Sequence, residues 1–119
     1  MAVGILISSD LMFISKVKEV AAAAQGEVKV VRSLEALEGA IAQAASPGAI
    51  MLDLEKSRIA IELLSEPIAR FSHMGWRIVS FFSHVHEDLG EEATRLGLGE
   101  VMARSKFVRV LPSLFSNVE

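Results

Sequence analysis

The residues whose types could do chemistry stand at the ends of apolar runs. Asp10 follows the first run, Asp53 ends the third, and Ser83 and Arg104 follow the fourth and fifth. Carboxylates are hard oxygen ligands that suit Mg²⁺, which commonly binds through one or two of them together with waters and phosphate oxygens. A hydroxyl and a cation could hold the remaining oxygens of a phosphoryl group. Whether these side chains meet depends on the elements that carry them.

Strand-like and helix-like segments alternate along the chain. Short apolar or alternating runs predict strands at residues 3–8, 27–31, 49–53, 76–83 and 100–104. Between the strands, apolar residues at helical spacing predict helices. We expect Pro67 to kink or end the third helix. We expect Pro112 to lie in the first turn of the last helix, whose buried face is formed by Leu111, Leu114, Phe115 and Val118.

This order of elements predicts the fold class. Mostly apolar strands that alternate with helices indicate a parallel sheet covered on both faces. Right-handed crossovers then give a doubly wound, five-stranded α/β domain that takes up residues 1–119 as one unit. In such domains the working site lies at the carboxyl ends of the strands, near the switch point. That is the edge at which we expect the polar residues to gather.

Composition limits the function further. The 119 residues include 12 basic and 15 acidic ones, which gives a net charge of −3, and no basic stripe of the kind that nucleic-acid binders carry. The chain has no cysteine and therefore no disulfide framework or thiol nucleophile. The apolar runs are too short to span a membrane, and the first residues lack the basic leader of a signal peptide. We expect a cytoplasmic protein that signals, if it signals, through another protein.

Four stretches give a more specific resemblance. "ILISSDLMF", "AIMLDLEKS", "IVSFFSHVHED" and "RLGLGEVMARS" resemble, in order and spacing, the conserved segments of receiver domains from two-component response regulators. The likeness covers nearly the whole chain. It implies the flavodoxin-like fold of that family and a role as a signalling module rather than an enzyme.

The resemblance also implies roles for particular residues. Asp53 would accept a phosphoryl group from the phosphohistidine of a histidine kinase. Asp10 and Asp53 would hold Mg²⁺ together with the backbone carbonyl of Glu55, and Ser83 would bond a phosphoryl oxygen and relay the modified state to the fourth helix. Receivers commonly meet partners, including a second copy, through the fourth helix and fifth strand. In this sequence that surface would lie around Leu98, Val101 and Phe107.

Four positions depart from the family pattern. Ser9 stands where the first acid of an acidic pair is usual, and Arg104 stands where the family has lysine. Val101 replaces a tyrosine or phenylalanine that swings inward on activation, and Ser57 replaces a proline in the loop after Asp53. Arginine is a planar fork and lysine a compact point charge, so their exchange at a tight phosphate contact is not conservative.

These departures favour an atypical receiver that works by protein–protein contact, with phosphorylation of Asp53 weak or absent. In this hypothesis Arg104 forms an ion pair with Asp53 or Asp10 and fills the site. The alternative is an orthodox Mg²⁺-dependent phospho-acceptor, because Asp10, Asp53 and Ser83 all remain. An alternative of another class is a small ligand-binding protein or enzyme on the same scaffold, but "SSDLMF" offers no glycine for a phosphate loop.

Simpler structural roles stay open for several of these residues. Asp10 could cap the first helix, since it directly precedes that helix, and Asp53 could be an ordinary strand end in water. Ser83 could be an ordinary loop serine. His84 and His86 form an H-x-H pair, which could hold a metal ion but lacks an evident third ligand, so we expect the pair to shape access to Asp53.

Overall fold

One parallel sheet forms the centre of the molecule. The computed structural model describes residues 2–115, so the expected position of Val118 lies outside the described part. The strand order is β2-β1-β3-β4-β5, and every neighbouring pair is parallel. The strands are β1 (Val3–Ile7), β2 (Glu27–Val31), β3 (Ala49–Asp53), β4 (Arg77–Phe82) and β5 (Glu100–Ala103). The sequence-based expectation of a doubly wound five-stranded sheet is confirmed.

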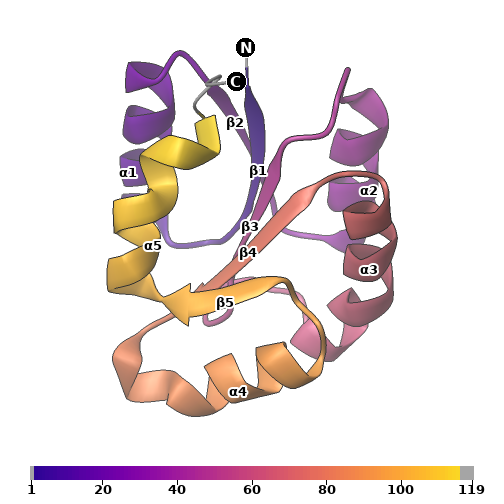
Figure 1. Ribbon diagram of the computed structural model, residues 1–119, viewed down its shortest axis with the longest axis vertical. Helices are drawn as coiled ribbons and strands as arrows, with labels where there is room; N and C mark the ends of the chain where they lie inside the picture. Colours follow the sequence, from indigo (N-terminus) through magenta and orange to yellow (C-terminus); the bar gives the residue numbers. More distant parts are fainter. Residues whose placement is uncertain (1, 116–119) are drawn as a thin grey trace.

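Helices cover both faces of the sheet. The α-helices are α1 (Leu11–Ala23), α2 (Leu34–Gln43), α3 (Ser65–His73), α4 (Glu87–Arg95) and α5 (Arg104–Val110). Short 3₁₀ turns precede α3 and α4 and follow α5, at η1 (Ile61–Leu64), η2 (His84–His86) and η3 (Leu111–Phe115). Helices α1 and α5 lie side by side on one face, and α2, α3 and α4 lie on the other (Figure 1). No helix within residues 2–115 has the length and apolar composition needed to cross a bilayer.

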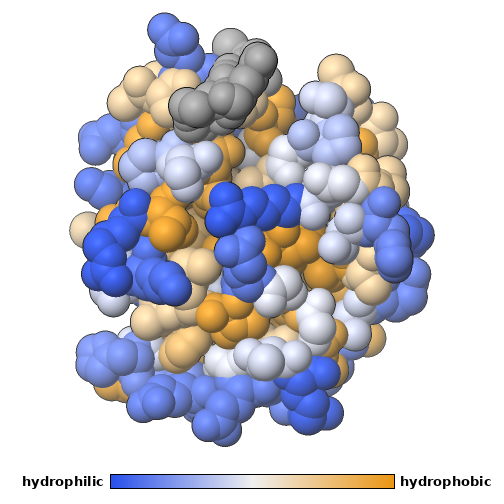
Figure 2. Space-filling model, viewed as in Figure 1, coloured by the Kyte–Doolittle hydropathy of each residue, from blue (hydrophilic) through white to orange (hydrophobic). Residues whose placement is uncertain are grey.

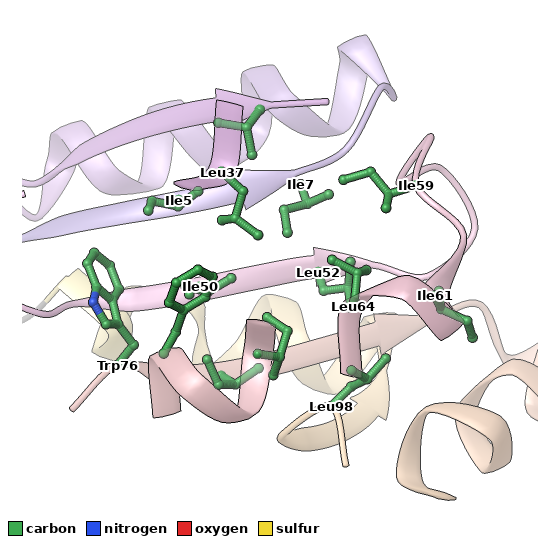
Figure 3. Close-up of a cluster of buried hydrophobic side chains, with 14 of the residues drawn as sticks. Ile5, Ile7, Leu37, Ile50, Leu52, Ile59, Ile61, Leu64, Trp76 and Leu98 are labelled. Carbon is green, nitrogen blue, oxygen red and sulfur yellow. The ribbon is translucent and has the colours of Figure 1, made fainter. Parts of the chain in front are cut away.

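Side-chain alternation divides the core into two layers. Ile5 and Ile7 of β1, with Ile50 and Leu52 of β3, point toward α2 and α3 (Figure 3). Trp76, directly before β4, closes this layer at the end of the sheet opposite the polar edge. The intervening residues face α1 and α5, where they pack with aromatic side chains; they include Leu6, Met51, Val79 and Phe81. The strands are therefore buried on both faces, as their continuous apolar runs indicate.

The first two helices begin at side-chain caps. Asp10 precedes α1, and its Oδ1 accepts the N–H of Phe13 at 3.1 Å. Ser33 precedes α2, and its Oγ accepts the N–H of Ala36 at 3.0 Å. These bonds satisfy N–H groups that the first turn of a helix leaves without partners. The capping role expected for Asp10 is confirmed.

Two expectations about proline are wrong. Pro67 lies in the first turn of α3, where a missing N–H breaks no helical hydrogen bond, so it neither kinks nor ends the helix. The chain reaches this helix through the 3₁₀ turn η1 instead. The last helix begins at Arg104 rather than near Pro112, and Pro112 lies in the 3₁₀ turn that follows α5. The strand predicted at 100–104 accordingly ends one residue earlier, at Ala103.

The chain reverses its winding at β1. From β1 it runs outward to β2 and then crosses back to β3 on the other side of β1. In open parallel sheets this reversal opens a crevice beyond the carboxyl ends of the two central strands. Here those strands end at Ile7 and Asp53, and the polar residues of the sequence follow them.

Candidate functional site

Asp53 lies at the bottom of the site and is closed off from water. It is the last residue of β3, and its side chain is 0 % exposed. Its Oδ1 accepts the backbone N–H groups of Glu55 and Lys56 at 3.1 and 3.2 Å. Its Oδ2 accepts the Ser8 hydroxyl at 2.8 Å. The chain itself therefore provides hydrogen bonds to both carboxylate oxygens.

Sequence reasoning did not identify Ser8 as a partner of Asp53. The register of the parallel ladder pairs Ile7 with Leu52, so Ser8 emerges from β1 beside Asp53. Ser8 is itself 0 % exposed, and its Oγ also accepts the N–H of Asp10 at 3.1 Å. The available signal in the sequence was that two apolar strands each end in a polar residue, Ser8 after β1 and Asp53 at the end of β3. In a parallel pair, such strand ends can lie side by side.

Arg104 lies between the two carboxylates of the site. One of its guanidinium nitrogens, Nη1, is 3.6 Å from Asp10 Oδ2, and the other, Nη2, is 3.7 Å from Asp53 Oδ2. The side chain is 32 % exposed, so the guanidinium covers Asp53 from the solvent side. The sequence predicted an ion pair with Asp53 or with Asp10. The structure shows both.

Aromatic rings beneath Arg104 fix its position. The guanidinium carbon is 4.6 Å from the centre of the Phe13 ring and 5.8 Å from that of Phe81. Phe81 in turn stacks on Phe107 with centres 4.2 Å apart. A guanidinium over an aromatic face is favoured by the ring quadrupole, more so where water is excluded.

Burial dominates the ionisation of Asp53. Loss of solvation raises the pKa of Asp53 above its ordinary value, because it disfavours the charged form. The Ser8 hydroxyl, the backbone N–H groups and the Arg104 charge lower the pKa and offset part of that rise. The groups that surround Asp53 therefore compensate for only part of the cost of burying its charge.

A third carboxylate, that of Glu55, extends across the site toward the segment that leads into α4. Its Oε2 accepts the backbone N–H of Ser83, the first residue after β4. Its Oε1 is 3.7 Å from Nε2 of His86. An open hollow of about 470 Å³ lies over this contact and over Arg104; its lining is Asp10, Glu55, Lys56, Ser83, His84, Ala103, Arg104 and Ser105.

The structure brings the predicted residues to one edge of the sheet, but the contacts of Ser83 and Glu55 differ from those that the resemblance implied. Asp10, Ser83 and Arg104 line the hollow, whereas Asp53 lies beneath it. Ser83 enters the network through its backbone N–H, and Glu55 through its side chain rather than its carbonyl. The phosphoryl-transfer roles of these residues stay predictions.

The arrangement fits an internal cation better than Mg²⁺. A magnesium ion needs near-octahedral oxygen ligands, usually one or two carboxylates with waters. Here Oδ2 of Asp10 and Oδ2 of Asp53 both face the Arg104 guanidinium, which would repel an ion placed between them. Among residues 2–115, no group of three or more acidic, histidine or cysteine side chains is placed to share an ion. The described residues therefore do not fit a magnesium ion.

Two solved structures share this fold over most of their length. The phosphorylated cyanobacterial phytochrome response regulator RcpA superposes with a TM-score of 0.72 at 20 % identity, covering 99 % of this chain and 96 % of that one. An uncharacterized protein from Neptuniibacter caesariensis superposes with a TM-score of 0.71 at 15 % identity, covering 96 % and 89 %. No protein-family model matches the sequence, and no curated protein matches it significantly. The chain therefore has the fold of a response regulator receiver domain over nearly its whole length.

Proposed function

We propose that the chain is an atypical receiver that acts in cytoplasmic signalling by protein–protein contact, with phosphorylation of Asp53 weak or absent. The observation that carries this proposal is the closure of Asp53. Its side chain is 0 % exposed, and hydrogen bonds or an ion pair from the chain reach both of its oxygens. The protein acts in this view as a binding module and not as an enzyme.

A phosphoryl acceptor needs an oxygen that can approach phosphorus. Nucleophilic attack requires a near-attack geometry with the reacting atoms about 3–3.5 Å apart. In this chain the Ser8 hydroxyl and the Arg104 guanidinium take up the outer oxygen of Asp53. Because arginine prefers carboxylates, which match its planar fork, Arg104 supports the closed site better than a lysine would.

The surface offered to a partner differs from the one expected from the sequence. Leu98 and Phe107 are each 0 % exposed and belong to the core, so the expectation that they form a docking surface is wrong. Val101 remains half-buried, in a shallow hollow between α4 and β5 that is lined by Phe82, Glu87, Gly90, Glu91, Thr94 and Val101. Hydrophilic residues cover α4 along the lower edge of the molecule, with hydrophobic ones directly above them (Figure 2). A histidine kinase, another signalling protein or a second copy of the chain would meet an acidic rim at this place.

Intact-mass spectrometry after incubation with acetyl phosphate and Mg²⁺ tests the proposal. We expect no phosphate-sized mass gain for the natural chain. Arg104→Lys serves as the matched variant, because it restores the residue that receivers usually carry and shortens the cover over Asp53. A gain in the natural chain that disappears in Asp53→Asn would contradict the proposal and establish an orthodox phospho-acceptor.

A further inference from the structure

Glu55 joins the loop after Asp53 to the entry of α4. Its backbone N–H donates to Asp53 Oδ1, and its carboxylate accepts the N–H of Ser83. Ser83 is followed at once by the turn η2 and by α4. One residue thus contacts both the buried acid and the segment that leads into the helix beside the expected partner surface.

The groups around Glu55 form a site suited to an anion, and the Glu55 carboxylate already occupies it. Lys56 and Arg104 line the same hollow, and the Ser83 N–H is a donor within it. A backbone N–H beside cationic side chains is a typical position for an oxyanion. Here the oxyanion is a carboxylate of the chain, and only 18 % of the Glu55 side chain is exposed.

We propose that Glu55 is the resident anion of this site, and that its bond to the Ser83 N–H fixes the segment from Ser83 to α4 without any modification of Asp53. The inference rests on the proposed function, since it gives the segment into α4 a contact that does not depend on a modified Asp53. Arg104 takes the place that an external cation would occupy beside Asp10 and Asp53. Glu55 takes the place that a bound oxyanion would occupy at the Ser83 N–H.

Residue-resolved hydrogen–deuterium exchange by NMR tests this directly, because the Ser83 amide is itself the bonded group. In Glu55→Ala we expect exchange of that amide to speed up by about tenfold or more. This is the protection that a hydrogen bond to a charged group gives and that the variant would lose. In Glu55→Gln the increase should be smaller, since a neutral acceptor is about half as strong. Glu91→Ala removes an exposed carboxylate of α4 and serves as the control, with no change expected at Ser83.

Sodium acetate provides a second arm of the test. A small carboxylate should enter the space that Glu55→Ala leaves and restore part of the lost protection at Ser83. Sodium chloride at the same ionic strength should not restore it, and the natural chain should respond to neither salt. If sodium chloride also restored the protection at Ser83, charge screening alone would explain the effect of acetate, and the inference would be overturned.

Unchanged exchange at Ser83 in Glu55→Ala would also overturn it. So would an equal rise in exchange throughout the sheet, because Glu55 would then support the fold as a whole and not the segment into α4. These measurements use no phosphodonor and no Mg²⁺. Labelling of Asp53 by acetyl phosphate would contradict the proposed function while leaving the Ser83 result to stand separately.

Discussion

Of the arginines that form ion pairs, Arg70 and Arg104 differ most clearly in geometry and setting. Arg70 on α3 lies 2.8 Å from Glu38 on α2, also bonds Glu66, and is 44 % exposed. Arg104 approaches Asp10 and Asp53 only to 3.6 and 3.7 Å, but Asp53 is 0 % exposed. Ion pairs exposed to water contribute little to the free energy of unfolding, even when their geometry is good. Breaking a buried pair costs much more, because it leaves a buried charge without compensation. The looser pair is therefore the one on which the fold and the site should depend.

The largest effect should come from removing the Arg104 charge. Arg104→Met keeps an unbranched apolar side chain over Phe13 but leaves Asp53 without its cation. We expect the free energy of unfolding to fall by about 3 kcal/mol, the lower end for a broken buried pair because Arg104 is partly exposed. Urea denaturation measures it. The double variant with Asp53→Asn should recover much of the loss, and no recovery would show that Arg104 acts through packing alone.

Ser8→Ala should have the next largest effect. It removes the hydroxyl that donates to the buried Asp53 Oδ2 at 2.8 Å. Hydrogen bonds to charged groups contribute about 1.5–3 kcal/mol, so we expect a loss of about 2 kcal/mol in the free energy of unfolding. Ser9→Ala, one residue along, removes a hydroxyl that bonds only the exposed Lys56 carbonyl and serves as the control. Equal losses in the two variants would contradict a specific role for Ser8.

The pH dependence of stability should have opposite signs at the two pairs. The raised pKa of Asp53 means that the folded state binds a proton more tightly than the unfolded one. Asp53 therefore costs stability progressively as pH rises from 3.8 through its raised folded value, and Asp53→Asn removes that cost. The lowered pKa of Glu38 stabilises the fold above 4.5 and loses that contribution as pH falls through its folded value. Urea denaturation of Asp53→Asn and Glu38→Gln between pH 3 and 7, compared with the natural chain, should give slopes of opposite sign; parallel slopes would refute this difference.

The smallest effect should come from the surface pair. Arg70→Ala removes contacts to Glu38 and Glu66, all of which are strongly exposed. We expect a loss of less than about 1 kcal/mol that shrinks further in high salt, because exposed ion pairs are screened. Thermal unfolding at low and high ionic strength measures it. A loss as large as that of Arg104→Met would reverse the comparison.

The sequence was sufficient to predict the sheet and the edge at which the site lies. Apolar runs determine which strands are buried, and Asp53 and Arg104 follow such runs. It was insufficient where tertiary contacts decide. The bond from the Glu55 side chain to Ser83 depends on how close two loops approach, and no spacing in the sequence reports that distance. Phe107 resembles a surface aromatic after a strand, yet helix α5 begins at Arg104 and turns it into the core.

The position of Trp76 gives the molecule a convenient optical property. It is the only tryptophan, the chain has no tyrosine, and it lies buried before β4, at the opposite end of that strand from Ser83. Its fluorescence therefore reports loss of the α2–α3 side of the core and is insensitive to small movements at the Asp53 edge. Tryptophan emission and amide exchange thus follow two separate events. Emission follows melting of the whole domain, and exchange at Ser83 follows local opening of the site.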